Sequence, residues 1–130
     1  MSSFAEMQAF ADLITDVDVY LFEAPGEATE YVLLLGGATF DVQERLTGSR
    51  GPRDVTVVAH AIAPRPREAQ WVADQVDGAV RPAGVGVIPL VEGRECDPIQ
   101  RDAALGPERD DTGAPYWDAI QEYSFRSRPA

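Results

Sequence analysis

The last dozen residues alternate between hydrophobic and polar side chains, and this alternation constrains the fold more than any other feature. Between Pro115 and Arg126, one parity carries the hydrophobic residues Trp117, Ala119, Tyr123 and Phe125. The pattern is interrupted only by Gln121 on the hydrophobic parity and by Ile120 on the polar one. Side chains of a β-strand point alternately to the two faces of a sheet, so this segment is predicted to be a half-buried strand. Such a strand closes a sheet, and the fold must be built around that sheet.

Two helices are predicted upstream, each from an apolar stripe at spacings of three and four residues. The first covers residues 3–15 and opens with a capping box formed by Ser3 and Glu6. Its stripe consists of Phe4, Met7, Ala11 and Ile14, widened by Phe10 and Leu13. The second helix begins at Pro66 and ends near Gly78. Its stripe consists of Ala69, Val72, Ala73, Val76 and Val80.

Further strands are predicted from short runs of β-branched and aromatic residues. These runs are Val17–Phe22, Glu30–Leu35, Val55–Ala63 and Val85–Glu92. We expect the first two to pair antiparallel across a turn at Ala24–Glu27, and Gly36 and Gly37 to end the second. Residues 97–102 are a further candidate. Because the helices are too few to cover both faces of a sheet, the order of elements predicts an α+β fold: a mixed or antiparallel sheet with two main helices on one face.

The polar segment at about 36–54 concentrates three arginines, Arg45, Arg50 and Arg53. Two interpretations are open: Phe40–Leu46 continues as a short strand, or the whole segment is an extended loop. A loop of this length inside a compact domain usually has a function. The segment is therefore either a solvated loop or an arm that contacts a neighbouring protein.

The composition favours some functions and excludes others. The chain has 130 residues, 45% of them hydrophobic, which fits one domain with a normal core. It carries 22 acidic and 11 basic residues, a net charge of −11, which argues against tight binding to phosphate backbones. No apolar run approaches the roughly 18 residues of a membrane span, and the first residues do not resemble a signal peptide. We therefore expect a cytoplasmic site of synthesis.

Few residues carry catalytic chemistry. His60 is the sole histidine and lies within a predicted strand, so we expect it to be packed or hydrogen-bonded. Cys96 is the sole cysteine, and no flanking signature marks it as a nucleophile, so we expect a structural thiol. The acidic turn with Glu108, Asp110 and Asp111 lacks the spacing of an EF-hand loop. The sequence therefore predicts no catalytic, cofactor-binding or metal-binding residue.

The predicted contacts are instead with other protein surfaces. Trp71 lies off the apolar stripe of its helix, where an aromatic side chain either packs at the rim or contacts another subunit. Together with Arg45, Arg50 and Arg53, Trp71 forms the candidate subunit or partner interface.

Several segments, taken in order, are similar to one protein family. Gln43–Gly48 is similar to a "DRLSG"-type patch before a central strand, although Gln-Glu replaces the more usual acidic start, and Pro66–Val76 is similar to a "PEQARWLADRV"-type helix. The other similar segments are Val19–Tyr20, Tyr31–Leu33, Val55–Val58, Asp97–Ile99, Asp110–Asp111 and the terminal strand. Together they resemble the tail terminator, or tail-to-head joining, proteins of long-tailed bacteriophages, especially the small ones of actinobacterial phages. The likeness extends over most of residues 17 to 128.

The resemblance implies a single tail-terminator-like domain over residues 1–130, with an extended loop or arm at about 36–54. It implies a structural virion protein, not an enzyme, that forms a homo-oligomeric ring, expected to be a hexamer. The ring would cap the tail tube at the tail–neck junction after assembly in the host cytoplasm. Its partners would be further copies of itself, the major tail tube protein and the head–neck completion proteins. DNA would pass through the channel without specific binding, and no membrane or cofactor would be involved.

Two alternatives remain open at this point. The first is a neighbouring virion component, either a head–tail stopper or connector or a tail-tube subunit. Stoppers are mostly β-barrels, so the predicted helix at 66–78 favours the terminator. The second is a small ligand-binding or enzymatic module built around His60 and Cys96.

Overall fold

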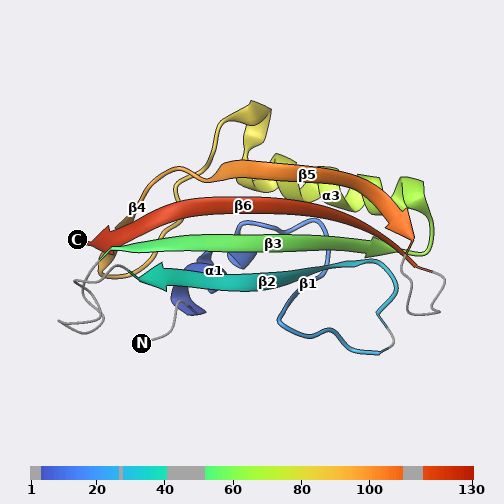
Figure 1. Ribbon diagram of the computed structural model, residues 1–130, viewed down its shortest axis with the longest axis horizontal. Coiled ribbons are helices and arrows are strands. Elements are labelled where there is room, and N and C mark those ends of the chain that lie inside the picture. The colour runs from blue at the N-terminus through green and yellow to red at the C-terminus, as the bar shows by residue number, and fades with distance from the viewer. Residues whose placement is uncertain (1–3, 27, 41–51, 110–115) are drawn as a thin grey trace.

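A computed structural model describes residues 4–26, 28–40, 52–109 and 116–130. In this part of the chain, one mixed sheet carries two α-helices on the same face, which confirms the predicted α+β class (Figure 1). Four strands lie side by side from one edge inward: β1 (Val19–Leu21), β2 (Tyr31–Phe40), β3 (Arg53–Ala63) and β6 (Trp117–Pro129). Two further strands pair with successive parts of β6 and lie end to end along its outer side: β4 (Arg94–Cys96) and β5 (Gln100–Arg109).

The centre of the sheet is the antiparallel pair β3 and β6, in register from Arg53 opposite Ser127 to Ala63 opposite Trp117. Every second residue of β3 is buried, and the same parity of β6 is buried or half-buried from Trp117 to Ser127, so the predicted alternation of the last strand is confirmed. Gln121 is buried too, and its amide donates a hydrogen bond to the carbonyl oxygen of Ala73 at 3.4 Å. The interruption of the pattern therefore marks a polar side chain that is satisfied inside the core.

Both helices pack on the buried face of the sheet. Helix α3 (Pro66–Val80) buries the five residues predicted for its stripe, and it continues two residues beyond Gly78. Helix α1 (Phe4–Asp12) is shorter than predicted, because a tight turn follows, in which Leu13 donates to the carbonyl of Phe10. No helix among the described residues is long and apolar enough to cross a bilayer.

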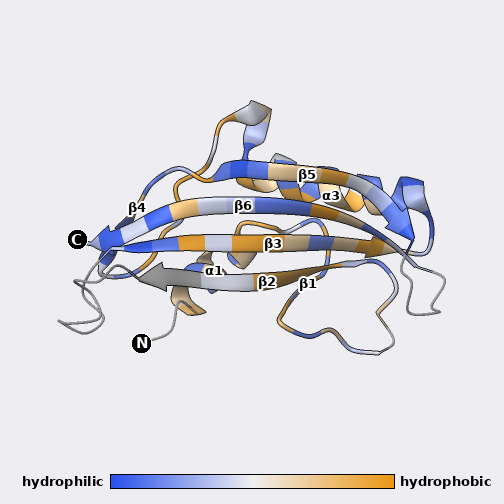
Figure 2. Cartoon of the chain, viewed as in Figure 1, coloured by the Kyte–Doolittle hydropathy of each residue, from blue (hydrophilic) through white to orange (hydrophobic). Residues whose placement is uncertain are grey.

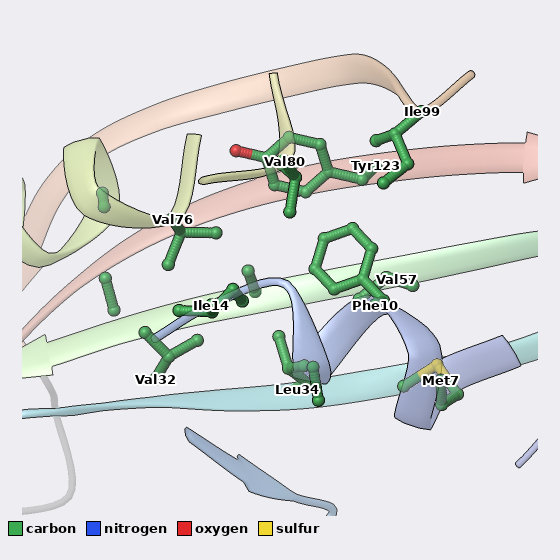
Figure 3. Packing of buried hydrophobic residues seen from close by; sticks show 14 of the residues in the cluster. Met7, Phe10, Ile14, Val32, Leu34, Val57, Val76, Val80, Ile99 and Tyr123 are labelled. Carbon is green, nitrogen blue, oxygen red and sulfur yellow. The ribbon is translucent and has the colours of Figure 1, made fainter. Parts of the chain in front are cut away.

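The core lies between the helices and the sheet. Its largest fully buried side chains include Phe10 and Tyr123, whose ring centroids are 5.4 Å apart in a tilted arrangement (Figure 3). Phe10 occupies this position while Phe4, which was predicted for the stripe, is 51% exposed. Central strand β3 is hydrophobic along most of its length, whereas the two ends of β5 are hydrophilic (Figure 2). Burial of the aromatic rings supplies a large share of the hydrophobic stabilisation.

The pairing of β1 with β2 corrects one prediction. The two strands are parallel, with Val19 opposite Val32 and Leu21 opposite Leu34, and not antiparallel. A parallel pair needs a connection that returns to the starting end of the first strand. Strand β1 has only three residues, roughly 10 Å, so the segment between Leu21 and Tyr31 is long enough to return.

The end of β2 corrects a second prediction. Gly36 and Gly37 do not end the strand, which continues to Phe40 in register with β3. Gly36 has a φ of +140°, and a Cβ added there would overlap the carbonyl oxygen of Thr56. Glycine therefore permits a close approach of the two backbones inside the strand. Because β3 begins at Arg53, the predicted arm is shortened at both ends, and residues 41–51 lie outside the described residues.

The strand predicted at Val85–Glu92 is a third correction. A 3-10 turn at Pro82–Gly84 follows α3, and the next residues form no strand. Val87 makes two isolated backbone hydrogen bonds, one to Val80 and one to Ile99. Pro89 has no N–H to donate, and the outer partners of β6 are instead β4 and β5.

Candidate functional site

One face of the sheet carries no helix, and we call it the open face. It consists of the side chains of β2, β3, β5 and β6 that point away from α1 and α3, and Figure 1 views the molecule from this side. Its aliphatic members are Leu33, Leu35, Val58, Ile62, Leu105 and Ile120. An antiparallel sheet with one solvated face normally alternates hydrophobic and polar residues, so these side chains would ordinarily be polar. Five of these six side chains are half-buried and Leu105 is exposed, so the face is more apolar than an ordinary solvated sheet face, which is typical of an interaction site.

An ion pair lies in the middle of the open face. Nδ1 of His60 donates a hydrogen bond to Oδ2 of Asp118 at 2.8 Å, because a carboxylate can only accept. This hydrogen bond raises the pKa of His60 above its ordinary value of 6.5, and the charge of Asp118 acts in the same direction, whereas burial opposes both. The prediction that His60 is a hydrogen-bonded strand histidine is confirmed. The other carboxylate oxygen, Oδ1 of Asp118, is buried without a hydrogen-bond partner among the described residues.

Cys96 lies on the opposite side of the sheet from His60. It stands opposite Ser127, on the parity that faces the helices, whereas His60 stands opposite Ile120 on the open face. The thiol is buried and free, and burial raises its pKa. A thiolate is the reactive form of cysteine, so this environment disfavours a nucleophile. The sheet separates the two residues, and they cannot form a catalytic pair.

The outer surface of α3 is the second exposed feature, and we call it the back face. It is the stripe opposite the buried one, formed by Arg67, Trp71, Asp74 and Gly78, which are all exposed. Trp71 is 47% exposed, so its ring lies on the surface and not at a buried rim. Arg67 and Trp71 are one helical turn apart and share a side of the helix. The position of Trp71 therefore leaves it available to a partner.

The three arginines of the candidate interface lie in different settings. Arg45 and Arg50 lie outside the described residues. Arg53 is only 6% exposed, and its Nη1 lies 3.1 Å and 3.4 Å from the two carboxylate oxygens of Glu6, which is fully buried. The structure thus gives Arg53 a role inside the monomer, where it joins β3 to α1. It also gives Glu6, expected in a capping box, a partner far away in the sequence.

A groove lies beside the segment that replaces the predicted strand at 85–92. It has a volume of about 570 Å³ and is lined by Ile88–Glu92, by β4 and by Arg128. Leu90 on its wall is 90% exposed, and Val85 nearby in the sequence is 70% exposed. The titratable residues that line the groove are Glu92, Arg94, Glu95, Cys96 and Arg128, and no histidine lies among them to activate the thiol of Cys96.

The described residues also hold no group of three or more acidic, histidine or cysteine side chains that could bind a metal ion. Asp110 and Asp111 of the predicted acidic turn lie outside the described residues. Sequence reasoning missed the open face as a surface, although one signal was available. Ile120 interrupts the polar parity of the last strand, and it lies in the centre of the open face beside His60.

Comparisons with known proteins show a likeness of fold. No protein-family model matches the chain, and no curated protein matches it either. A chain in a solved structure, described as the virion of a native gene transfer agent (GTA) particle, superposes with a TM-score of 0.60. The likeness covers 97% of this chain and 91% of that chain at 16% sequence identity. The two chains therefore share a fold over nearly their whole lengths.

Proposed function

We propose that this protein is a structural component of a phage-like virion, and that it forms a ring which caps the tail tube and joins it to the neck. The observation that carries the proposal is the shared fold with a chain of a gene transfer agent virion, over 97% of this chain. The segments that resemble tail terminators support the more specific role at the end of the tube.

The surfaces of the monomer support assembly. A closed ring of identical subunits needs two different patches on each subunit, because each copy contacts the next through a heterologous interface. The open face and the back face are two such patches, and they point in opposite directions from one sheet. Within the described residues the sheet carries two helices on one side, and its strands do not close into the barrel expected of a stopper.

The charge of the chain supports a role around passing DNA. Each chain has a net charge of −11, so a ring of several chains is strongly acidic. An acidic channel repels the phosphate backbone and leaves no fixed cationic site to hold translocating DNA.

The proposal is tested by electron microscopy of tail-tube protein from the same phage, allowed to polymerise with and without this protein. With the protein present, we expect tubes that are shorter than those grown without it, and that carry additional ring-shaped density at one end. Tubes grown without the protein are the control for length. Tubes of unchanged length and bare ends would contradict the proposed role.

A further inference from the structure

The two exposed faces differ in their unpaired charges. On the open face, Glu122 stands opposite Val58, and Glu108 stands opposite Asp118. Neither glutamate forms an ion pair or a side-chain hydrogen bond within the part of the chain that the structure describes. Oδ1 of Asp118 lacks a donor in the same region. The open face therefore presents the carboxylates of Glu122 and Glu108 beside aliphatic side chains that surround the His60–Asp118 pair.

The helix side of the molecule carries both charges: the exposed carboxylates of Asp12 and Asp74, and several arginines whose guanidinium groups have no partner among the described residues. The guanidinium groups of Arg65 and Arg67, at the start of α3, form no ion pair or hydrogen bond with any described residue. Arg109 stands opposite Trp117 in the sheet, on the helix side. Its guanidinium group likewise has no ion-pair or hydrogen-bond partner in the described ranges. Five other arginines are tied to carboxylates inside the monomer: Arg53, Arg81, Arg101, Arg126 and Arg128. Three arginines with unpaired guanidinium groups thus lie on the helix side of an acidic chain, and Arg67 is one helical turn from Trp71.

We propose that the back face of α3 in one copy packs on the open face of the next copy. The inference rests on the proposed ring and names the surfaces that form it. Trp71 would lie on the aliphatic centre of the neighbouring sheet, and Arg67 would pair with Glu122. Asp74 also lies on the back face, where it accepts a hydrogen bond from Gln70 at 2.9 Å, so the back face carries one cation and one anion.

The dimensions of the two faces agree. The exposed stripe from Arg67 to Gly78 is about 16 Å long at 1.5 Å per helical residue. The stretch of β3 from Thr56 to Ile62 is about 20 Å long at 3.3 Å per strand residue. One helix therefore covers the central part of the open face, as a helix layer covers a sheet inside a domain.

Charge complementarity favours a second copy of this chain as the occupant. Arg67 on the back face needs an acidic partner, and the unpaired carboxylate of Glu122 on the open face supplies one on the same molecule. An apolar centre with an aromatic anchor and a charged margin is the usual anatomy of a protein interface. Duplex DNA offers no aliphatic surface to cover the open face, and the net charge of −11 opposes its approach.

Charge reversal on each face tests the proposal. We would prepare Arg67→Glu and Glu122→Arg, and follow assembly by native mass spectrometry and light scattering. Each variant alone places like charges across the interface, so we expect the concentration for half-assembly to rise at least about tenfold. The matched control is Glu92→Arg, which reverses an exposed charge outside both faces and should assemble as the wild type does. Thermal unfolding of each variant establishes that the monomer is folded.

Mixing the two defective variants gives the sharpest readout. In a 1:1 mixture arranged in alternation, the glutamate introduced on the back face of one variant meets the arginine introduced on the open face of the other. At the remaining contacts the native Arg67 meets the native Glu122, so every contact in the alternating ring is attractive. We expect assembly to recover on mixing, with equal numbers of the two variants in each ring. A defect in folding alone would not be rescued by mixing.

The outcomes separate this inference from the proposed function. If the wild type forms rings and both variants form them equally well, the proposed faces are wrong and the ring stands. If the variants form rings but no longer cap tubes, the faces bind the tube and not a second copy, which also overturns the inference. A wild-type chain that stays monomeric and leaves tubes uncapped contradicts the proposed function itself.

Discussion

The buried ion pair between Glu6 and Arg53 gives a quantitative prediction about the monomer. Arg53→Met removes the guanidinium that lies 3.1 Å and 3.4 Å from the carboxylate oxygens, and leaves Glu6 charged at a fully buried position. Removal of one partner of a buried pair typically costs about 3–5 kcal/mol, because the remaining charge is uncompensated. Small domains have a total stability of about 5–15 kcal/mol, so the variant should be only marginally folded.

Urea unfolding followed by tryptophan fluorescence measures this loss. The double variant Glu6→Leu with Arg53→Met removes both charges, and it should recover most of the lost stability, because no buried charge remains. A loss below about 1 kcal/mol for Arg53→Met, less than the typical effect of a point substitution, would refute a structural role for the pair. In that case Arg53 would again be a candidate for the interface with Arg45 and Arg50.

Three further predictions follow from the geometry. Because the folded pKa of His60 is raised above 6.5, its pairing with Asp118 stabilises the protein fully below pH 6.5, and this contribution is lost as the pH rises through the folded value. The stability difference between wild type and His60→Asn should therefore shrink with rising pH, and an NMR titration of His60 with a midpoint at or below 6.5 would contradict the assignment. Tyr123→Phe should cost about 1–2 kcal/mol in urea unfolding, because the hydroxyl donates to Asp77 at 3.0 Å and contacts Gln121, whereas Tyr20→Phe on the half-exposed β1 should cost less. In a gel shift at low salt, duplex DNA should not bind to the protein. Non-specific DNA-binding proteins reach dissociation constants of only ~10⁻⁴ to 10⁻⁶ M, so a dissociation constant below about micromolar would contradict the claim that DNA passes through the channel without being held.

The elements that could be predicted from the sequence are those in which local periodicity and tertiary burial agree. The stripe of α3 from Ala69 to Val80 and the alternation of β6 are both continuous over more than ten residues, and both are buried as expected. Long amphipathic segments determine which of their sides is buried, because only one side can exclude water.

The parts that could not be predicted depend on contacts between segments far apart in the sequence. Parallel pairing of β1 with β2 is determined by the path of a connecting loop, and strand periodicity carries no information about it. In the sequence, Gly36 is typical of the end of a strand. In the structure, it allows the backbone of β2 to lie close to the carbonyl oxygen of Thr56, and this contact forms only when β2 and β3 pair. The Glu6–Arg53 pair joins residues 47 positions apart, so neither residue reveals its partner.

The candidate site shows the same limit. Trp71 could be placed on the outer side of its helix, because a helix has a fixed period, and its exposure agrees with that placement. The open face could not be predicted, because its aliphatic residues come from four strands and meet only after the sheet is assembled. Taken alone, each of them except Ile120 is typical of an ordinary strand residue, and Ile120 signals only an interruption of the polar parity.

The central claim is that this chain assembles into a closed ring, and native mass spectrometry of the purified protein tests it most directly. The chain has a mass of 14.1 kDa, so six copies have six times that mass, about 85 kDa. We predict one dominant closed species, at this mass for a hexamer, that replaces the monomer as the concentration rises. A monomer at every concentration, or an open series of masses without a preferred number of copies, would contradict the ring.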